Sequence, residues 1–267
     1  IEQWGSIIAN EGGKVGEREL KKSFDNPYVA GNPVSGKLFV GRQDIFRRFE
    51  ELWSGSGELP AIVLYGHRRM GKSSILRNLG AHFGGDTVLV YFDMQRLGIV
   101  QNTAELLFNA ALEIYDTLKK TGISGLIEPQ LSDFAESWAN GFNAFLRSVE
   151  KVLSGKRLVF AIDEFELIEQ NIADGIVEKR FLVYWRGLIQ GVDWLTLAFA
   201  GLHTLNEMAK DYWNPFYGSV EMIKVSYLSY ADARRLIENP TDDFAIDYES
   251  GATELIIKLT NGQPYLV

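Results

Sequence analysis

The sequence predicts an α/β fold with a mainly parallel β-sheet, and three observations lead to that prediction. Short apolar runs alternate along the chain with longer segments in which apolar residues recur at helical spacing. The chain has 267 residues, enough for a full α/β domain and the start of a second one. Glycine or acidic residues directly follow several apolar runs, at the strand ends where parallel sheets hold their ligands.

The composition excludes several classes of protein. Hydrophobic residues make up 46% and charged residues 23% of the chain, as in soluble globular proteins. The formal charge of −8 argues against a protein whose whole surface binds nucleic acid, although a small basic patch is compatible with it. The absence of cysteine excludes disulfides, thiolate zinc sites and cysteine nucleophiles. No apolar run approaches the roughly 18–20 residues of a membrane span, and the start does not resemble a secretion signal, so we expect a cytoplasmic location and no membrane contact.

Both ends of the chain suggest a fragment of a longer protein. The sequence begins at Ile1 without a methionine and stops at Val267 inside an apolar run. Residues 1–24 have a mixed composition, and we expect them to be a linker or the end of a preceding module. Pro27 and Pro33 then favour an extended path.

Helical spacing begins at Gln43, directly after the segment Phe39-Val40-Gly41-Arg42. This segment has two interpretations. It is either a tight turn that enters the helix or one wall of a base pocket, because Gly41 would let the backbone approach the edge of a base. The segment alone favours neither.

The most specific motif is G-x-x-x-x-G-K-[ST] at positions 66–73, between an apolar strand over 61–65 and a helix that opens at 73–79. Gly66 and Gly71 let the backbone fold so that its N–H groups face phosphate oxygens, and the helix start adds the positive end of its dipole. Lys72 can reach the β- and γ-phosphates, and the Ser73 hydroxyl can hold Mg²⁺. We therefore predict a loop that binds ATP or ADP through Gly66, His67, Arg68, Arg69, Met70, Gly71, Lys72, Ser73 and Ser74.

The next apolar run, 87–92, predicts a second strand, and helices are expected over 104–119 and 134–153. The aromatic residues of the second helix are interpreted as core packing. A third strand over 157–162 ends in Asp163 and Glu164. Asp163 can hold the magnesium through water, and Glu164 can polarise a water for attack on the γ-phosphate. The alternative is a solvated acidic turn, and we expect Glu166 and Glu169 beyond it to form a solvated helix face.

The remaining elements complete the alternation. A helix over 181–188 precedes a strand over 194–200 that ends at Gly201, and His203 or Thr204 is then placed to sense the γ-phosphate. A lone histidine is otherwise usually a packed or surface residue. A fifth strand is expected over 220–225, followed by helices over 229–238 and 250–259. Gly262 is typical of a helix end, and Pro264 of the start of the next helix.

Five short segments occur one after another along the chain, at 39–42, 66–73, 162–164, 201–203 and 262–264. Together they resemble the STAND class of AAA+-related P-loop ATPases, and also the origin-recognition-like ATPases of archaea and bacteria. The resemblance implies a three-layer P-loop NTPase sandwich with a five-stranded, mainly parallel sheet in the order 5-1-4-3-2. It also implies an ATPase core over 25–228 and the start of a helical lid domain over 229–267.

The resemblance further assigns roles to individual residues. Val40, Gly41 and Arg42 would flank the adenine, and Pro264 would touch the nucleotide from the lid. Lys72, Glu164 and the sensor His203 would be the catalytic residues. Many members carry Ser or Thr directly after the glycine of the sensor strand, where Leu202 stands here, so the sensor stays open between His203 and Thr204. Arg186 is a candidate arginine finger, although an ordinary surface arginine is the simpler interpretation.

Three functions fit these features. The first is a slowly hydrolysing regulatory switch in a multidomain signalling protein, where exchange of ADP for ATP controls conformation and homo-oligomerisation. Its effector and sensor domains would then be fused outside this fragment. The second is a nucleic-acid-loading ATPase of the origin-recognition kind, whose DNA-binding domain would lie beyond Val267, since nucleic-acid binding by the fragment itself is not expected. The third is a scaffold that binds nucleotide without hydrolysing it.

Overall fold

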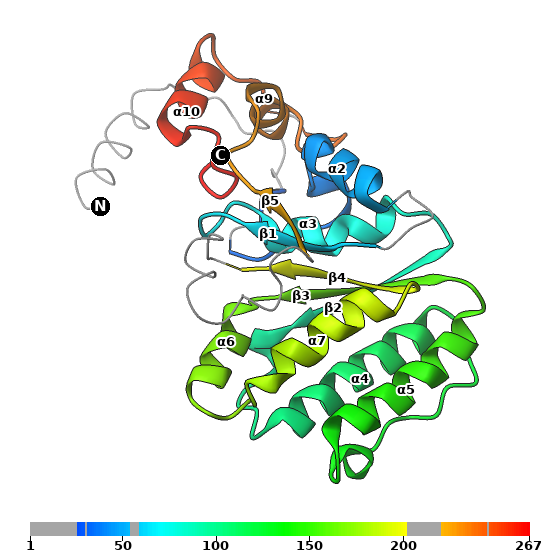
Figure 1. Ribbon diagram of the computed structural model, residues 1–267. Helices are drawn as coiled ribbons and strands as arrows, with labels where there is room; N and C mark the ends of the chain where they lie inside the picture. Colours follow the sequence, from blue (N-terminus) through cyan, green and yellow to red (C-terminus); the bar gives the residue numbers. More distant parts are fainter. Residues whose placement is uncertain (1–25, 30, 54–58, 202–219, 245) are drawn as a thin grey trace.

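The apolar runs of the sequence form the five strands of one sheet. The computed structural model describes residues 26–29, 31–53, 59–201, 220–244 and 246–267. The strands are β1 (Ala61–Tyr65), β2 (Thr87–Asp93), β3 (Arg157–Asp163), β4 (Leu195–Ala200) and β5 (Val220–Lys224), and they lie in the order β2-β3-β4-β1-β5 with every pairing parallel (Figure 1). Read from the other edge, this is the predicted order 5-1-4-3-2, which is therefore confirmed.

Helices cover both faces of the sheet, so the molecule has three layers (Figure 1). Alternate residues of each strand point to opposite faces, and β1 shows this clearly. Ala61 and Val63 pack under the helices α4, α5, α6 and α7, whereas Ile62 and Leu64 pack under α2 and α3. The helix bounds are α2 (Gln43–Trp53), α3 (Lys72–Asn78), α4 (Thr103–Lys120), α5 (Trp138–Leu153), α6 (Glu166–Ala173), α7 (Arg180–Gly191), α9 (Tyr230–Glu238) and α10 (Ala252–Thr260).

The helix expected over 134–153 begins later than the sequence suggested. Residues Leu131–Phe134 form a separate 3₁₀ turn, and α5 starts at Trp138 because Ser137 caps it, with the Ser137 hydroxyl accepting from the Asn140 backbone N–H. The interpretation of its aromatic residues holds, since Trp138, Phe142 and Phe145 are buried in the core. The other 3₁₀ turns are η1 (Gly36–Leu38), η2 (Leu79–Ala81) and η3 (Met94–Leu97).

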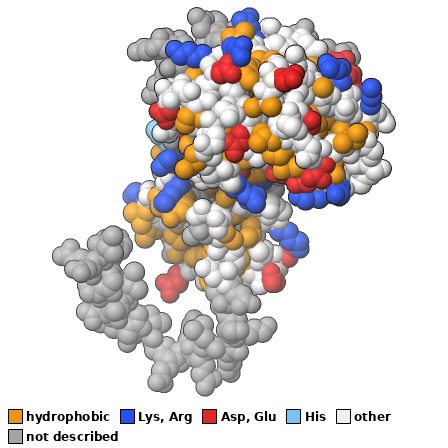
Figure 2. Space-filling view, turned by 90° about the horizontal axis from the view of Figure 1, so that it is seen from below, with side chains coloured by type: hydrophobic (Ala, Val, Ile, Leu, Met, Phe, Trp, Pro, Cys, Tyr) orange, Lys and Arg blue, Asp and Glu red, His pale blue; other side chains and the backbone are white. Residues whose placement is uncertain are grey.

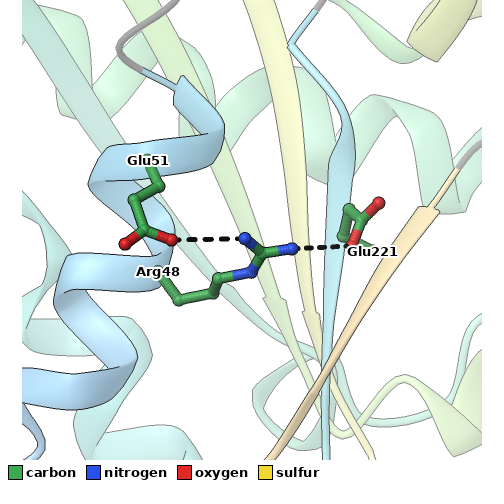
Figure 3. A network of polar contacts seen from close by, with 3 residues as sticks. All are labelled: Arg48, Glu51 and Glu221. Carbon is green, nitrogen blue, oxygen red and sulfur yellow. Dashed lines mark hydrogen bonds and ion pairs between the residues drawn. The ribbon is translucent and has the colours of Figure 1, made fainter.

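Helix α2 is tied to the edge of the sheet by one arginine. Arg48 donates to Glu51 of the same helix at 3.2 Å and to Glu221 of β5 at 3.5 Å (Figure 3). All three side chains are substantially exposed, so these ion pairs add little to stability. The buried residues Phe46 and Phe49 on the other side of α2 hold it to the core.

The last two helices lie together beyond β5 (Figure 1). Helix α10 ends where Asn261 and Gly262 take left-handed φ angles of 52° and 70°, as expected of a helix-ending pair. Pro264 lies in a turn in which the Leu266 and Val267 N–H groups both donate to the Gln263 carbonyl. No helix in the described ranges is long and apolar enough to cross a bilayer.

Candidate nucleotide-binding site

The loop between β1 and α3 has a backbone that only glycine permits at two points. Gly66 and Gly71 have φ angles of 149° and 88°. A Cβ atom on Gly66 would lie 2.3 Å from the Val225 carbonyl oxygen, so the loop packs directly against the chain that leaves β5. The N-terminus of α3, beginning at Lys72, faces the loop. This is the predicted strand–loop–helix arrangement, which directs backbone N–H groups and a helix dipole to one place.

Lys72 lies across its own loop. Its ammonium donates to the carbonyl oxygens of Gly66 at 2.9 Å and His67 at 3.0 Å. Burial lowers the pKa of Lys72, while the negative charges of Glu166, Glu164 and Asp163 act in the opposite direction. A phosphate group would compete with these two carbonyls for the ammonium, which its flexible four-carbon stem allows.

Asp163, at the end of β3, is only 5% exposed and is hydrogen-bonded through both carboxylate oxygens. Its Oδ2 accepts from the Tyr91 hydroxyl at 2.5 Å, and its Oδ1 accepts from the Glu164 backbone N–H at 3.1 Å. The Ser73 hydroxyl lies close enough to influence this carboxyl. Burial raises the pKa of Asp163, and the Tyr91 and Ser73 hydrogen bonds partly offset this. The two residues predicted to serve the metal therefore lie close together.

This donor set fits magnesium, which prefers oxygen ligands and keeps several of its waters. Within the described ranges no group of three or more His, Asp or Glu side chains could hold a metal ion by itself. A magnesium ion here would therefore rely on the Ser73 hydroxyl, on water next to Asp163 and on phosphate oxygens, as the sequence motif predicts.

Glu164 follows with a left-handed φ angle of 54°, which non-glycine residues adopt rarely. Burial, followed by the adjacent carboxyl of Glu166, raises the pKa of Glu164 to about 7. The two neighbouring acids thus have different environments. Asp163 accepts two hydrogen bonds, whereas Glu164 faces the carboxyl of Glu166. A solvated acidic turn, the alternative interpretation of this pair, is inconsistent with the burial of Asp163 and the partial burial of Glu164.

Glu166 does not lie on a solvated helix face, and that prediction was wrong. Both of its carboxylate oxygens are buried, and the carboxyl of Glu164 lies against them. A Cβ atom on Gly201 would stand 3.2 Å from Glu166 Oε2. Among the neighbouring acids, Glu166 has the largest effect on Lys72, and its negative charge raises the pKa of that residue. The reason is the anchoring of the turn before α6, where the Phe165 N–H donates to the Ala200 carbonyl at 3.0 Å. Glu169 is also partly buried.

The strand expected to carry the sensor lies where the prediction placed it. Strand β4 runs between β1 and β3, and the Gly201 N–H donates to the Leu64 carbonyl at 3.3 Å. Its end therefore adjoins both the phosphate loop and the acids. His203 and Thr204, the two sensor candidates, and Leu202 lie outside the described residues.

A cavity of about 270 Å³ opens beside the loop. Two segments that are distant in sequence meet in its wall, because Val40 and Arg42 line it together with Pro264. The lining is mostly apolar, which suits the flat face of a base. The complete lining consists of Tyr28, Val29, Val34, Leu38, Phe39, Val40, Arg42, Met70, Gly71, Ser74, Leu228, Leu236, Pro264, Tyr265, Leu266 and Val267.

Gly41 and Arg42 shape this cavity through contacts with other parts of the chain. Gly41 has a φ of 80°, and a Cβ atom there would lie 2.5 Å from Cγ of Asp232 in α9. The Arg42 side chain is 6% exposed and donates to the Met70 carbonyl at 2.8 Å and the Tyr227 carbonyl at 3.2 Å. Burial lowers the pKa of Arg42. The segment is also the helix entry, because the N–H groups of residues 45 and 46 donate to the Arg42 carbonyl.

Ser74 and Asn78 hold the opposite wall. The Ser74 hydroxyl accepts from the Val34 N–H at 3.1 Å. Asn78 accepts from the Gly36 N–H and donates to the Val34 carbonyl, each at 3.0 Å. Asn78 was not among the predicted site residues. An asparagine one turn after Ser74 on the apolar side of a helix was the signal that could have identified it.

The other loop residues differ in exposure. His67, Arg68 and Arg69 are exposed, whereas Met70 is buried. The Arg69 guanidinium lies 3.7 Å from the ring centre of Tyr265, a cation–π contact that joins the phosphate loop to the segment after α10.

Comparison with known proteins agrees with this geometry. No protein-family model and no curated protein matches the chain. Among solved structures, the Walker-type ATPase PABY2304 of Pyrococcus abyssi matches with a TM-score of 0.65 and 18% identity, over 85% of this chain and 65% of that one. The chain has the P-loop NTPase fold. The Aeropyrum pernix ORC1 protein in complex with DNA matches with a TM-score of 0.57 and 12% identity, over 86% of this chain and 58% of that one.

A third solved structure is similar as well. The Aeropyrum pernix ORC2 protein, solved as ADPNP–ADP complexes, matches with a TM-score of 0.52 and 13% identity, over 81% of this chain and 54% of that one. The chain thus spans between 54% and 65% of the length of these three proteins. At such identities the similarity extends to the fold, and the STAND class is not singled out by it.

Proposed function

We propose that this chain binds and hydrolyses ATP with the help of Mg²⁺. The observation that carries the proposal is that Asp163 lies close enough to Ser73 and Lys72 of the phosphate loop for the three groups to influence one another. This proximity joins the phosphate loop after β1 to the acid at the end of β3, two strands away in the sheet. Lys72 and Glu164 flank the Ser73–Asp163 pair. A hydroxyl, a carboxylate, an ammonium and a second carboxylate at one sheet edge are the groups that phosphoryl transfer to water requires.

Each residue has a distinct task in this proposal. The loop N–H groups and Lys72 would hold the phosphates, and Ser73 and Asp163 are the residues that would hold the metal ion. The bound magnesium would neutralise charge on the phosphates. Glu164 accepts the proton of the attacking water, a task for which a carboxyl with a raised pKa is suited. Val40 and Arg42 from one segment and Pro264 from another line the cavity that would hold the adenine, and Gly41 allows α9 to approach.

Adenine is the proposed base, because the apolar cavity suits its flat faces and the guanine-reading Asn-Lys-x-Asp motif does not occur in the sequence. The division into a core over 25–228 and a lid over 229–267 is part of the same proposal. The Gly41–Asp232 and Arg69–Tyr265 contacts support it, since both join the nucleotide site to the proposed lid.

Two wider roles are compatible with such an ATPase. The first is the slow regulatory switch, with fused effector and sensor domains and ATP-dependent oligomerisation. The second is a nucleic-acid-loading ATPase, and the comparisons favour it, because one of the similar structures is an ORC1 protein in complex with DNA. Acidic and basic side chains are interspersed on the face shown in Figure 2, so DNA contact would have to come from a local patch or from other parts of a longer protein.

The test is a nucleotide titration by calorimetry combined with a phosphate-release assay. Binding of ADP and ATP with release of phosphate supports the proposal, and binding without release supports the scaffold. A Lys72→Ala variant that retains both binding and release would refute the phosphate assignment. Salt-sensitive DNA binding by the longer protein, with affinity that falls steeply as salt rises, separates the loading ATPase from the switch.

A further inference from the structure

We propose that Tyr91 is a positioning residue of the magnesium site, whose hydroxyl holds the Asp163 carboxylate in the orientation that faces Ser73. This inference rests on the proposed function and adds a residue to it from the neighbouring strand. The Tyr91 hydroxyl donates to Asp163 Oδ2 at 2.5 Å, within the range of a hydroxyl bond to a carboxylate.

The sheet register explains how Tyr91 reaches Asp163. Tyr91 of β2 lies opposite Ala161 of β3, and Asp163 stands two residues further along the same strand. Residues two apart on a strand point to the same face, so the Tyr91 ring can extend over β3 toward the carboxylate. The small side chain of Ala161, which is fully buried, leaves room for the ring to pass.

Arg77 supports the ring from the helix layer. It lies on α3, the helix that begins with Lys72 and Ser73, and its guanidinium is 4.7 Å from the Tyr91 ring centre. The Arg77 Nε is buried and has no hydrogen-bond partner, so the ring contact offsets part of the cost of burying this nitrogen. Tyr91 is thus held between β3 and the helix that carries the metal-binding hydroxyl.

Each oxygen of the Asp163 carboxylate accepts from a different donor, and Tyr91 is the donor to one of them. Oδ1 is held by the Glu164 N–H, and Oδ2 by Tyr91. Asp93, directly opposite Asp163 in the register, accepts from the Gln95 N–H and so caps η3. Removing the Tyr91 hydroxyl would leave Oδ2 without this donor, and the Glu164 N–H bond to Oδ1 alone would fix the carboxylate less firmly. A metal-bound water would then lose a fixed acceptor, and outer partners of this kind set metal affinity by about 10–100-fold.

The experiment compares ADP binding by calorimetry in excess MgCl₂ and in EDTA, for the wild type, Tyr91→Phe and Tyr184→Phe. Tyr184 is the matched control, because its partly buried hydroxyl also donates to a side-chain oxygen, that of Asn143 at 2.8 Å. We expect Tyr91→Phe to bind ADP in EDTA as the wild type does, and to lose about tenfold of the gain that Mg²⁺ gives. Tyr184→Phe keeps the full gain.

Arg77→Met is a second variant, in which the tyrosine is retained and only its support is removed. It should lose part of the same Mg²⁺-dependent gain. A Tyr91→Phe protein that is folded, as judged by its melting curve, and keeps the full gain would overturn the inference while leaving the proposed function intact. A wild type whose ADP binding does not respond to Mg²⁺ would instead overturn the metal assignment, and this inference with it.

Discussion

Gly66 and Val225 lie so close together that no side chain fits between them. A Cβ atom on Gly66 would stand 2.3 Å from the Val225 carbonyl oxygen. The phosphate loop after β1 is therefore seated on the chain that leaves the edge strand β5. The Val225 N–H in turn donates to the Tyr65 carbonyl at 2.8 Å, so the start of the loop is held by two contacts with the same residue.

Substitution of Gly66 by alanine should damage both folding and binding. The added methyl group meets a backbone oxygen, and the φ of 149° disfavours a side chain, so we expect a loss of about 1–3 kcal/mol in the free energy of unfolding. ADP affinity should fall as well. Gly187→Ala is the control, because Gly187 lies in α7 with open space around it. It should stabilise the protein by about 0.5–1 kcal/mol, as measured by urea unfolding. Equal effects of the two changes would refute this explanation.

Glu166→Gln should stabilise the protein and slow hydrolysis. Asp163, Glu164 and Glu166 all act on the single ammonium of Lys72, and the buried Glu166 oxygens face the carboxyl of Glu164. Replacing the Glu166 carboxyl by an amide removes this repulsion and supplies an N–H donor, which should raise stability by about 1 kcal/mol, seen as a higher melting temperature. Phosphate release should decrease, with Glu169→Gln on the same helix as the comparison. A lower melting temperature together with unchanged phosphate release would contradict the site role of Glu166.

Asn78→Ala should weaken base binding more than phosphate binding. The change removes the hydrogen bonds to Gly36 and Val34 that hold one wall of the cavity, at a cost of about 1–3 kcal/mol in stability. ADP affinity should fall, whereas the affinity for inorganic pyrophosphate should change little, as measured by calorimetry. The exposed Asn140 gives the control, Asn140→Ala. Equal losses of affinity for ADP and for pyrophosphate would show that this wall of the cavity does not contribute to binding the base.

The pH dependence of stability should report on Glu164. Burial and the adjacent Glu166 raise its pKa to about 7 in the folded protein, from the usual 4.5. Between these values the folded state binds more protons than the unfolded state, so this group lowers stability as pH rises from about 4.5 to 7. Without nucleotide, the melting temperature of the wild type should therefore fall relative to that of Glu164→Gln across this range. Parallel curves for the two proteins would contradict the raised pKa.

Glu164→Gln should also separate hydrolysis from binding. Loss of the base should reduce phosphate release by about 10²–10⁴-fold, while ADP affinity stays close to that of the wild type. The glutamine retains the size of the side chain and removes only its ability to accept the proton. Full hydrolysis by this variant would show that the base has been assigned wrongly.

The strands and the phosphate loop were predictable because their causes are local. The run Ala61 to Leu64 is buried on both faces of the sheet, and such a strand is continuously apolar in sequence. The loop needs glycine at positions 66 and 71, so the sequence motif alone predicts its backbone conformation. The strand order, by contrast, came from the resemblance to P-loop ATPases, because the sequence of one strand does not show which strands lie beside it in the sheet.

The residues that were missed depend on partners far along the chain. An acid in the first turn of a helix, such as Glu166, usually faces solvent. Here it is buried because the turn before it is bonded to Ala200 at the end of β4. Tyr91 gave no signal for the same reason, as its target lies 72 residues away on the next strand. The Ser137 cap, which delays the start of α5, was local and could have been predicted from its sequence.

The most direct test of the account is a calorimetric titration of ADP and MgCl₂ into the wild type and Lys72→Ala. The Lys72 ammonium donates to the carbonyls of Gly66 and His67. When nucleotide binds, it must exchange these carbonyls for phosphate oxygens. The predicted result is saturable binding by the wild type and none by a folded Lys72→Ala protein. Equal binding by the two proteins would contradict the claim that this loop holds the phosphates.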